Sequence, residues 1–361
     1  MPRRQRILVA MSGGVDSSVV AGLLVRRGFD VVGVTMQIWQ ESQTDPRHAG
    51  CCSLGAVEDA RRVAASLGIP YYVINFKEEF RQSVIEHFLD EYERGRTPNP
   101  CVECNRTVKF DLLWQKMKEI GCDKIATGHY ARIRKDRRGF RLMRARAVEK
   151  DQSYAVYMLS QEQLAQTMFP LGELSGKAET RRIARELGLP VADKPDSQEI
   201  CFVSEAGGYT EFLKKSRPSA FVKGDIVDVD GTKLGEHDGV ANYTVGQRKR
   251  IRLNLDGRPL YVLRVEPATN RVVVGRDEDL AKTTVLFENV VDSPYYRRDA
   301  RVAGKIRSTM PPAPATLREG SPNRADFAKP VRAVAPGQTA VFYAGATVVA
   351  GGPIVGAEGA A

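Results

Sequence analysis

The sequence predicts an α/β protein in which a Rossmann-like parallel sheet is followed by a small connecting domain and a C-terminal β-barrel-like domain. Three observations support this fold class. The first half of the chain alternates helical patterns with short apolar strands. From about Thr210 onward, short strands are broken by Asp-Gly, Gly and Pro turns. The third observation is length, because 361 residues suffice for two or three domains with buried cores.

The alternation in the first half repeats one unit, a helical pattern that ends at a glycine and is followed by an apolar strand. The unit occurs in "RRGFDVVGVTM", "SLGIPYYVINF" and "EIGCDKIATGHY", where Gly28, Gly68 and Gly121 stand at the expected helix C-caps. The helix before the second strand has apolar residues at i, i+3 and i+4 spacing, namely Ala56, Ala60, Val63, Ala64 and Leu67. Strands and helices in this order predict a parallel sheet with right-handed crossovers.

Changes of texture along the chain predict the domain limits. We expect a first domain over residues 1–209, with part of 165–190 packing on the next domain, a central connecting domain over 210–280 and a C-terminal barrel-like domain over 281–361. Near the end, "TAVFYAGATVVAGGPIV" has the pattern of a hairpin and its continuation. The proline-rich "MPPAPATLREGSP", residues 310–322, is expected to be a loop.

The stretch "AMSGGVDSSVVA" lies between the apolar strand "RILV" and a helix expected over residues 16–27. Its two glycines permit backbone dihedrals and close approaches that a side chain forbids, and Ser and Asp favour helix starts. The first amides of such a helix, with the positive end of its dipole, form an anion site that most often binds phosphate. The stretch matches neither G-x-x-x-x-G-K-[ST] nor G-x-G-x-x-G. An ordinary turn does not require Ser-Gly-Gly and Asp-Ser together, so we predict a phosphate-binding loop.

Three residues from separate strands are expected to meet at one edge of the sheet. Ser12, Met36 and Gly128 all lie at or just past the end of a predicted strand. Ligands of open parallel sheets bind beyond the carboxyl ends of the strands. The sequence therefore predicts a single pocket there.

Composition limits the cellular setting. No apolar run approaches the ~20 residues that a membrane helix needs, so no membrane association is expected. The basic N-terminus, "MPRRQRILVAM", has too short an apolar stretch for a signal peptide. We expect a cytoplasmic protein whose six cysteines are reduced and matter as thiols or ligands.

The net charge of +10 comes from two separate windows. Residues 132–150 hold nine Lys or Arg against two Asp or Glu, and residues 297–332 hold nine against three, which leaves the rest of the chain at −3. Either window alone could be a solvated face. Two such clusters on an otherwise slightly acidic chain favour a polyanionic partner, with nucleic acid the leading candidate.

Two cysteine contexts stand out. "TPNPCVECNRTVKF" contains Cys101 and Cys104, and "DSQEICFV" contains Cys201. The C-x-x-C spacing is compatible with a zinc knuckle completed by Cys51 and Cys52. Adjacent cysteines are poor zinc ligands, however, and Cys201 would be left unexplained. Free cysteines are also commonly buried as small apolar residues.

Six segments together resemble the bacterial tRNA-specific 2-thiouridylases. They are "MSGGVDSSV", "CCSLGAVEDARRVA", "TPNPCVECN", "IATGHYAR", "KDQSY" and "SQEICF", in the expected order over most of the first two hundred residues; "YTVGQRKR" and "KIRS" extend the likeness more weakly. These enzymes of the ATP-pyrophosphatase-loop class place sulfur on the wobble uridine of certain tRNAs. The resemblance implies an ATP-dependent sulfurtransferase with Mg²⁺ beside the nucleotide and the tRNA anticodon loop as partner.

The resemblance also assigns the nucleotide contacts. ATP would activate the uracil 2-oxygen by adenylation, with pyrophosphate and AMP released in turn. Asp16 would support catalysis or metal placement, and Ala10 stands where relatives often have glycine. The residues that the likeness places against ATP are Ala10, Met11, Ser12, Gly13, Gly14, Val15, Asp16, Ser17, Met36 and Gly128.

For the sulfur, the resemblance implies that Cys201 carries a persulfide and that Cys104 is its partner nucleophile, with a transient Cys104–Cys201 disulfide. The terminal sulfur attacks the activated carbon directly, or Cys104 first releases it as sulfide; both routes stay open. Cys101 stands where many relatives have Asp. The sulfur would come from a sulfur-delivery protein or a cysteine desulfurase.

For the tRNA, the resemblance points to three stretches. Anticodon bases are single-stranded and can be splayed into a pocket. Ser308 replaces an expected Tyr, which removes a stacking surface. The implied contacts are Asn99, Pro100 and Cys101 for the target base, Lys150, Asp151 and Gln152, and Arg307 and Ser308.

Three alternatives remain open from the sequence. One is another adenylating enzyme of the SGGxDS class, which would need neither Cys104 nor Cys201. Another is a zinc-stabilised RNA-binding protein that uses the nucleotide only for regulation. The third keeps the reaction but uses an iron–sulfur cluster on Cys101, Cys104 and Cys201 with Cys51 or Cys52. His129 in "ATGHY" is a general base or, more commonly for such a position, structural.

Overall fold

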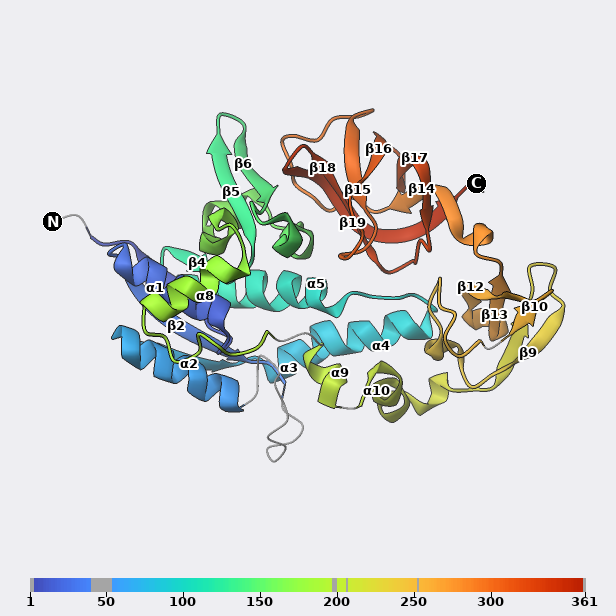
Figure 1. The fold of residues 1–361 in the computed structure, drawn as a ribbon, viewed down its shortest axis with the longest axis horizontal. Coiled ribbons are helices and arrows are strands. Elements are labelled where there is room, and N and C mark those ends of the chain that lie inside the picture. The colour runs from blue at the N-terminus through green and yellow to red at the C-terminus, as the bar shows by residue number, and fades with distance from the viewer. Residues whose placement is uncertain (1–2, 40–53, 197–199, 206, 252, 360–361) are drawn as a thin grey trace.

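The structure is a computed structural model that describes residues 3–39, 54–196, 200–205, 207–251 and 253–359. Three bodies follow one another along the chain: an α/β body at the N-terminus, a small sheet body and a C-terminal barrel (Figure 1). This arrangement confirms the predicted fold class. Among the described residues, no helix is long and apolar enough to cross a bilayer.

The α/β body is built on a five-stranded sheet with the order β3-β2-β1-β4-β7. All four pairings are parallel, as the alternation of helices and strands predicts. The strands are β1 (Arg6–Ala10), β2 (Asp30–Gln37), β3 (Tyr71–Asn75), β4 (Lys124–Ala126) and β7 (Thr167–Met168). Side chains of central strand β1 alternate between faces: Leu8 packs in one hydrophobic cluster, whereas Ile7 and Val9 pack in another.

One face of the sheet is covered by α1 (Val15–Arg26), α2 (Leu54–Leu67) and α8 (Lys177–Glu186), which share a hydrophobic cluster with Ile7 and Val9. The predicted apolar stripe of α2 is buried at four of its five positions and half-buried at Leu67. Gly28, Gly68 and Gly121 all have positive φ, which confirms the expected left-handed helix ends.

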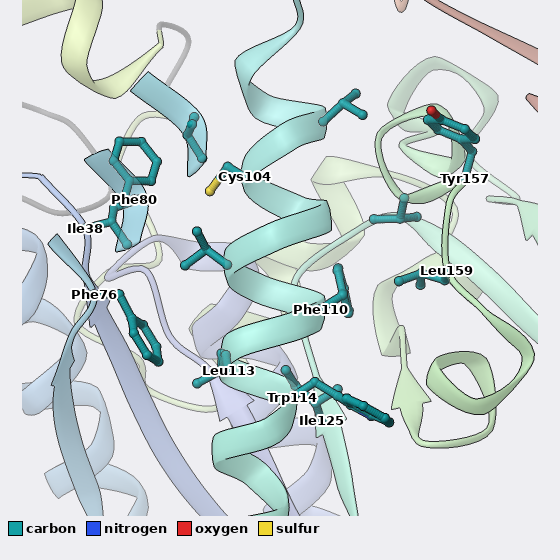
Figure 2. Packing of buried hydrophobic residues seen from close by; sticks show 14 of the residues in the cluster. Ile38, Phe76, Phe80, Cys104, Phe110, Leu113, Trp114, Ile125, Tyr157 and Leu159 are labelled. Atoms are coloured by element: carbon teal, nitrogen blue, oxygen red, sulfur yellow. The ribbon is translucent and has the colours of Figure 1, made fainter. Parts of the chain in front are cut away.

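Two long helical runs cover the other face. The first joins α3 (Lys77–Phe80), a π-helical turn (Arg81–Ile85) and α4 (Glu86–Glu93). The second joins α5 (Pro100–Cys104), a π-helical stretch (Asn105–Leu112) and α6 (Leu113–Glu119). Both contribute to a large hydrophobic cluster, called here the main cluster, in which Cys104, Phe110 and Trp114 lie along the second run (Figure 2).

Shorter elements complete the α/β body and lead out of it. The short α-helices are α7 (Gln161–Ala165), α9 (Cys201–Glu205) and α10 (Tyr209–Ser216). Single 3₁₀ turns lie at Val148–Lys150, Ser153–Val156, Pro170–Glu173 and Pro218–Ala220, and in later parts of the chain at Val240–Asn242, Pro267–Thr269 and Glu278–Leu280.

The small sheet body contains a four-stranded sheet with the order β12-β13-β8-β9 and a separate β10–β11 pair. Its own hydrophobic cluster includes Ile226, Val262 and Val272. The strands are β8 (Gly224–Val227), β9 (Lys233–His237), β10 (Asn254–Leu255), β11 (Arg258–Pro259), β12 (Tyr261–Glu266) and β13 (Arg271–Gly275).

The barrel consists of six strands, β14 to β19, and closes through the pairing of β14 with β19. They are β14 (Ala281–Phe287), β15 (Arg301–Lys305), β16 (Ala313–Arg318), β17 (Asn323–Arg332), β18 (Thr339–Ala344) and β19 (Thr347–Glu358). The expected loop over 310–322 is wrong in its middle, because β16 lies there and pairs with both β15 and β17.

A hairpin from the α/β body joins the barrel sheet. Its strands are β5 (Ala131–Asp136) and β6 (Gly139–Arg144), and β6 pairs with β19 at Met143 and Thr347. The hairpin therefore connects two parts of the chain that are about 200 residues apart in sequence. The domain limits after residues 209 and 280 stay predictions.

Candidate active site

The turn between β1 and α1 has the geometry of an anion-binding loop. Gly13 has φ +68°, and a Cβ there would lie 2.1 Å from the carbonyl oxygen of Ala56 on α2, so only glycine fits. Gly14 is the N-cap of α1, and it provides no side-chain acceptor for the first amides of the helix. The positive end of α1 is thus left without a capping side chain of its own.

Serine hydroxyls hold this loop together. Ser17 Oγ accepts a hydrogen bond from the amide of Ser12 at 3.1 Å and donates to the carbonyl of Gly14 at 3.2 Å. Ser18 Oγ donates to the same carbonyl at 2.9 Å. Both serines are buried, so these hydroxyls fix the shape of the loop from the inside.

The ends of the three predicted strands meet around this loop. Met11 donates its amide to Val34 of β2 at 2.8 Å and accepts a hydrogen bond from Thr35 Oγ1 at 2.7 Å. A Cβ on Gly128 would lie 3.0 Å from both Asp16 Cβ and Ser17 N, so the chain after β4 packs directly on the start of α1. This proximity agrees with the shared edge predicted from Ser12, Met36 and Gly128.

Asp16 belongs to a network of charges that we call the ion-pair cluster: Asp16, Lys177, Asp196, Lys150 and Arg181. Lys177 Nζ lies 2.8 Å from Asp16 Oδ1 and 2.7 Å from Asp196 Oδ1. Asp196 also faces Arg181 at 3.3 Å and Lys150 at 3.7 Å. Burial by itself would raise the pKa of Asp196, but the hydrogen bond and charge of Lys177, with Lys150 and Arg181, hold it below its ordinary value.

Two further side chains brace the loop. Tyr130 donates its hydroxyl to Asp16 Oδ1 at 3.0 Å and lies 2.8 Å from Thr180 Oγ1. Lys194 Nζ donates to the carbonyl of Gly13 at 3.0 Å and pairs with Asp59 at 2.6 Å. No motif in the sequence singles out Tyr130, Lys177, Arg181 or Lys194. The i, i+4 spacing of Lys177 and Arg181 on α8 is the only sequence signal, and it is common on exposed helix faces.

The first predicted cysteine context starts a helix. Asn99 is the N-cap of α5, where its Oδ1 accepts a hydrogen bond from the amide of Val102 at 3.2 Å, and Pro100 follows at the first helical position. Cys101 is exposed in the first turn, whereas Cys104 is buried one turn later. In Figure 2, the Cys104 sulfur points toward the side of the helix where Ile38 and Phe80 lie.

Cys201 begins α9 and is half-buried against the main cluster. The next residue, Phe202, is almost fully buried, with its ring centroid 4.9 to 6.2 Å from those of Trp39, Phe80, Phe88 and Phe212. Cys104 lies in the same cluster, and Ala10 and Met36 also pack against it. One hydrophobic cluster therefore supports the two cysteines and two of the residues predicted to contact ATP.

The metal alternatives fall partly outside the described residues, since Cys51 and Cys52 are not among them. Within the described ranges, no three His, Cys, Asp or Glu residues are grouped as metal ligands. Of the four described cysteines, Cys101 is exposed, Cys104 and Cys122 are buried, and Cys201 is half-buried.

The three residues of the predicted tRNA-contacting stretch, 150–152, differ in burial and in contacts. The Asp151 carboxylate is only 2% exposed and accepts hydrogen bonds from the amides of Ala145 and Ser153 and from Ser153 Oγ, beside Arg144. Within the fold, the Asp151 carboxylate holds the end of the β5–β6 hairpin. Lys150 is 40% exposed, and Gln152 accepts from the amide of Tyr130.

The two basic windows lie on one eight-stranded sheet. Residues 132–150 form the β5–β6 hairpin and the turn after it, and residues 297–332 include β15 to β17 of the barrel. Arg307, which is half-buried, and Ser308, which is exposed, lie in the turn that follows β15. Just before them, burial lowers the pKa of Lys305, which lies over the Tyr154 ring. The structure thus places both windows on one sheet, with β18 and β19 between them.

His129 lies after β4 among aromatic side chains. Its ring packs between Phe110 and Phe169, and its Nδ1 lies 2.8 Å from Thr127 Oγ1. Desolvation, with a smaller contribution from the charge of Lys109, lowers the pKa of His129 to about 3. A pKa this low makes the imidazole too weak a base to accept a proton effectively near neutral pH, which favours the structural interpretation over a general base.

Comparison with known families covers most of the chain. Residues 5–205 match the family described as tRNA methyl transferase HUP domain, residues 210–276 the tRNA methyl transferase PRC-barrel domain, and residues 287–354 the aminomethyltransferase beta-barrel domain.

Full-length relatives are also found among curated proteins. The tRNA-specific 2-thiouridylase MnmA of Clostridioides difficile (strain 630) is 45% identical over 356 residues, which are 97% of this chain and 98% of that protein. The protein of the same name from Heliobacterium modesticaldum is 47% identical over 360 residues, 98% of this chain and 93% of that protein. A solved 4-thiouridine synthetase–RNA complex with bound ATP is 18% identical over 60% of this chain and 51% of that chain, with a TM-score of 0.37, which is too low to support an argument.

Proposed function

This chain belongs to the family of tRNA-specific 2-thiouridylases, and from that premise we propose that it replaces the 2-oxygen of the wobble uridine in tRNA with sulfur in an ATP-dependent reaction. The observation that carries this proposal is the main cluster, on which Ala10, Met36, Cys104 and Cys201 all pack. A nucleotide bound at the edge of the sheet and a sulfur carrier on Cys201 could then both react with the same substrate base.

The loop fits a nucleotide. Gly13 leaves no room for a side chain, and the start of α1 has no capping side chain, so phosphates can approach its amides. We propose that residues 10–17, with Met36 and Gly128, bind ATP. The Asp16 carboxylate, one-third exposed at the same helix start, would hold Mg²⁺, which neutralises phosphate charge when bound.

In the first step, the uracil 2-oxygen attacks the α-phosphorus of ATP. A bond forms between the 2-oxygen and the α-phosphorus, the bond from the α-phosphorus to the bridging oxygen breaks, pyrophosphate leaves, and the base loses its N3 proton. The amides of the first turn of α1, which have no capping side chain, would stabilise the negative charge that develops on the phosphates. The base is then activated, because AMP is a far better leaving group than oxide.

In the second step, the terminal sulfur of a Cys201 persulfide becomes bonded to C2, and AMP leaves with the former 2-oxygen. Cys104 thiolate attacks the inner sulfur of Cys201, which breaks the persulfide bond and forms the Cys104–Cys201 disulfide. If Cys104 acts first, the same disulfide forms and hydrosulfide is the nucleophile at C2. In both routes a thiol reductant must reopen the disulfide before the next persulfide is loaded by a sulfur-delivery protein or cysteine desulfurase.

The tRNA would approach through its anticodon loop. We propose contacts from Asn99, Pro100 and Cys101 to the target base, and from Lys150, Gln152, Arg307 and Ser308 to the surrounding RNA. The two basic windows, which lie on one sheet, would supply positive charge for the phosphate backbone. Asp151 would contribute through its backbone, since its carboxylate is used within the fold. Because tRNA and ATP would be its substrates, we propose that the protein acts in the cytoplasm. We also propose domain limits after residues 209 and 280.

The direct test is reconstitution with metal-free protein, unmodified tRNA, Mg-ATP and a persulfide or sulfide donor. Digested tRNA is analysed by mass spectrometry for 2-thiouridine. The wild type is expected to form it, and Cys201→Ser should lose persulfide-dependent formation by at least about 100-fold. Cys122→Ser is the matched control, because Cys122 is a buried thiol of the same cluster at the far end of the helical run.

Other outcomes would support different functions. Pyrophosphate release without thiolation, even with an excess of persulfide, would indicate another acceptor of the SGGxDS class. Absence of both products, together with tightly bound zinc or iron before metal removal, would favour the metal-binding alternatives. Loss of activity in Cys101→Ser but not in Cys104→Ser would exchange the roles proposed for these two cysteines.

A further inference from the structure

The ion-pair cluster connects three parts of the candidate site that lie far apart in sequence. Asp16 is in the ATP loop, Lys150 is in a predicted tRNA-contacting stretch, and Asp196 lies shortly before Cys201. Lys177 contacts two of them, since its Nζ is 2.8 Å from Asp16 and 2.7 Å from Asp196. We propose that Lys177 is a positioning residue that couples ATP binding to tRNA binding. This inference rests on the proposed function, because it needs both ligands.

The basic side chains that contact Asp196 differ in how easily they can move, and the most mobile one will respond first to a bound ligand. Arg181 is fixed, because its guanidinium also donates to the carbonyls of Ala192 and Lys194, both at 2.8 Å. Lys150 has the longest contact with Asp196, 3.7 Å, and its side chain is 40% exposed. A phosphate of bound RNA can therefore draw Lys150 away from Asp196 at low cost.

Among the described residues, removal of Lys150 leaves Asp196 with two basic partners in place of three. Asp196 then attracts Lys177 more strongly. The flexible side chain of Lys177 can shift its ammonium group from the carboxylate of Asp16 toward that of Asp196, while Arg181 stays in place. Lys177 is only 14% exposed, so this redistribution occurs where water screens it weakly. A shift toward Asp196 loosens the hold on Asp16 and leaves its carboxylate available to the nucleotide side of the loop.

The consequence is positive coupling in both directions. Bound tRNA tightens the binding of the nucleotide, and bound nucleotide tightens the binding of tRNA by the same factor. Couplings of this kind are typically about 5- to 150-fold. We expect about tenfold for the wild-type protein, which would limit unproductive hydrolysis of ATP when no tRNA is present.

The experiment measures the Kd of α,β-methylene-ATP with Mg²⁺ by calorimetry, with and without a saturating unmodified tRNA transcript. This analogue cannot release pyrophosphate, so the readout is binding alone. Lys177→Met and Asp196→Asn are each expected to reduce the tenfold coupling to less than twofold, and Lys177→Arg should keep most of it. Asp196→Asn provides a second test at a more exposed position if Lys177→Met folds poorly.

The matched control is Lys194→Met. Lys194 also holds the ATP loop, through Gly13 and Asp59, but it has no ion pair with Asp196 in the described part of the chain. Its loss should weaken nucleotide binding and leave the coupling factor intact. Coupling that survives in Lys177→Met, or that disappears equally in Lys194→Met, would overturn the inference, as would a wild-type factor near one. If the wild type forms 2-thiouridine but the coupling factors contradict the inference, the inference alone is wrong. If the wild type forms no 2-thiouridine, the proposed function is wrong.

Discussion

The two ends of the candidate site are held by different forces. The phosphate end, residues 12–17 with Lys177 and Lys194, is fixed by hydroxyl–backbone hydrogen bonds and ion pairs. The sulfur end, Cys104 and Cys201, is supported by the aromatic side chains around Phe202. Polar contacts hold the loop, whereas packing holds the thiols.

This difference separates ligand binding from stability. Ion pairs at a partly exposed site contribute little to folding but can orient charges toward a ligand, so changes at the phosphate end should affect affinity more than stability. Aromatic packing contributes mainly to folding. Changes at the sulfur end should therefore lower the free energy of unfolding first.

The largest expected effect is at the sulfur end. Phe202→Ala removes a ring that contacts four other aromatic rings and leaves a cavity in the main cluster. We expect the free energy of unfolding to fall by about 3–5 kcal/mol in urea denaturation. The Kd for Mg-ATP of the remaining folded protein should change less than threefold. Equal losses in stability and ATP affinity would contradict the separation of the two ends.

Gly13→Ala should give the opposite pattern. The new Cβ would meet the Ala56 carbonyl at 2.1 Å in a backbone with φ +68°, so the loop must move. Strain of about 3 kcal/mol corresponds to roughly a 100-fold weaker Kd for Mg-ATP, measured by calorimetry. Gly14→Ala is the matched control, since its Cβ would meet only Ser12 Oγ at 3.5 Å and its φ is −95°. Similar losses in both variants would argue against a special requirement at Gly13.

These effects differ in how far sequence alone anticipates them. The loop could be predicted because the Gly and Ser residues that shape it lie within six consecutive positions, 12–17. The ion-pair cluster could not, because Lys177 and Asp16 are 161 positions apart and charges on α8 are typical of a solvated helix face. Nor did the sequence indicate β16: its prolines suggest a loop, yet Ala315 and Leu317 alternate inward and pair with neighbours supplied by the closed barrel.

His129 offers a pH-dependent test between the two ends. Its pKa is about 3 in the fold and about 6.5 in the unfolded chain, so the unfolded state takes up the proton first as the pH falls. The stability associated with neutral His129 is present above pH 6.5 and is lost progressively toward pH 3. Between pH 7 and pH 5, the wild type should lose about 2 kcal/mol more than His129→Asn in urea unfolding. Parallel profiles for both proteins would mean that folding does not lower the pKa of His129.

The smallest expected effect sharpens the role of Asn99, which is both a helix cap and a predicted contact of the target base. Asn99→Ala removes the acceptor for the Val102 amide and should cost about 1 kcal/mol of stability. Asn99→Asp keeps that acceptor and should retain stability, but it lacks the amide donor for the base. We expect both variants to lose thiolation activity by mass spectrometry; normal activity in Asn99→Asp would leave Asn99 with the capping role alone.

The measurement that tests the central claim most directly is tRNA-dependent exchange of labelled pyrophosphate into ATP, compared between Asp16→Asn and Cys201→Ser. If the phosphate end activates the base before the sulfur end acts, Cys201→Ser keeps the exchange while forming no 2-thiouridine, and Asp16→Asn loses both. Loss of exchange in Cys201→Ser, with Mg-ATP binding intact, would contradict two ends that act in sequence on one base.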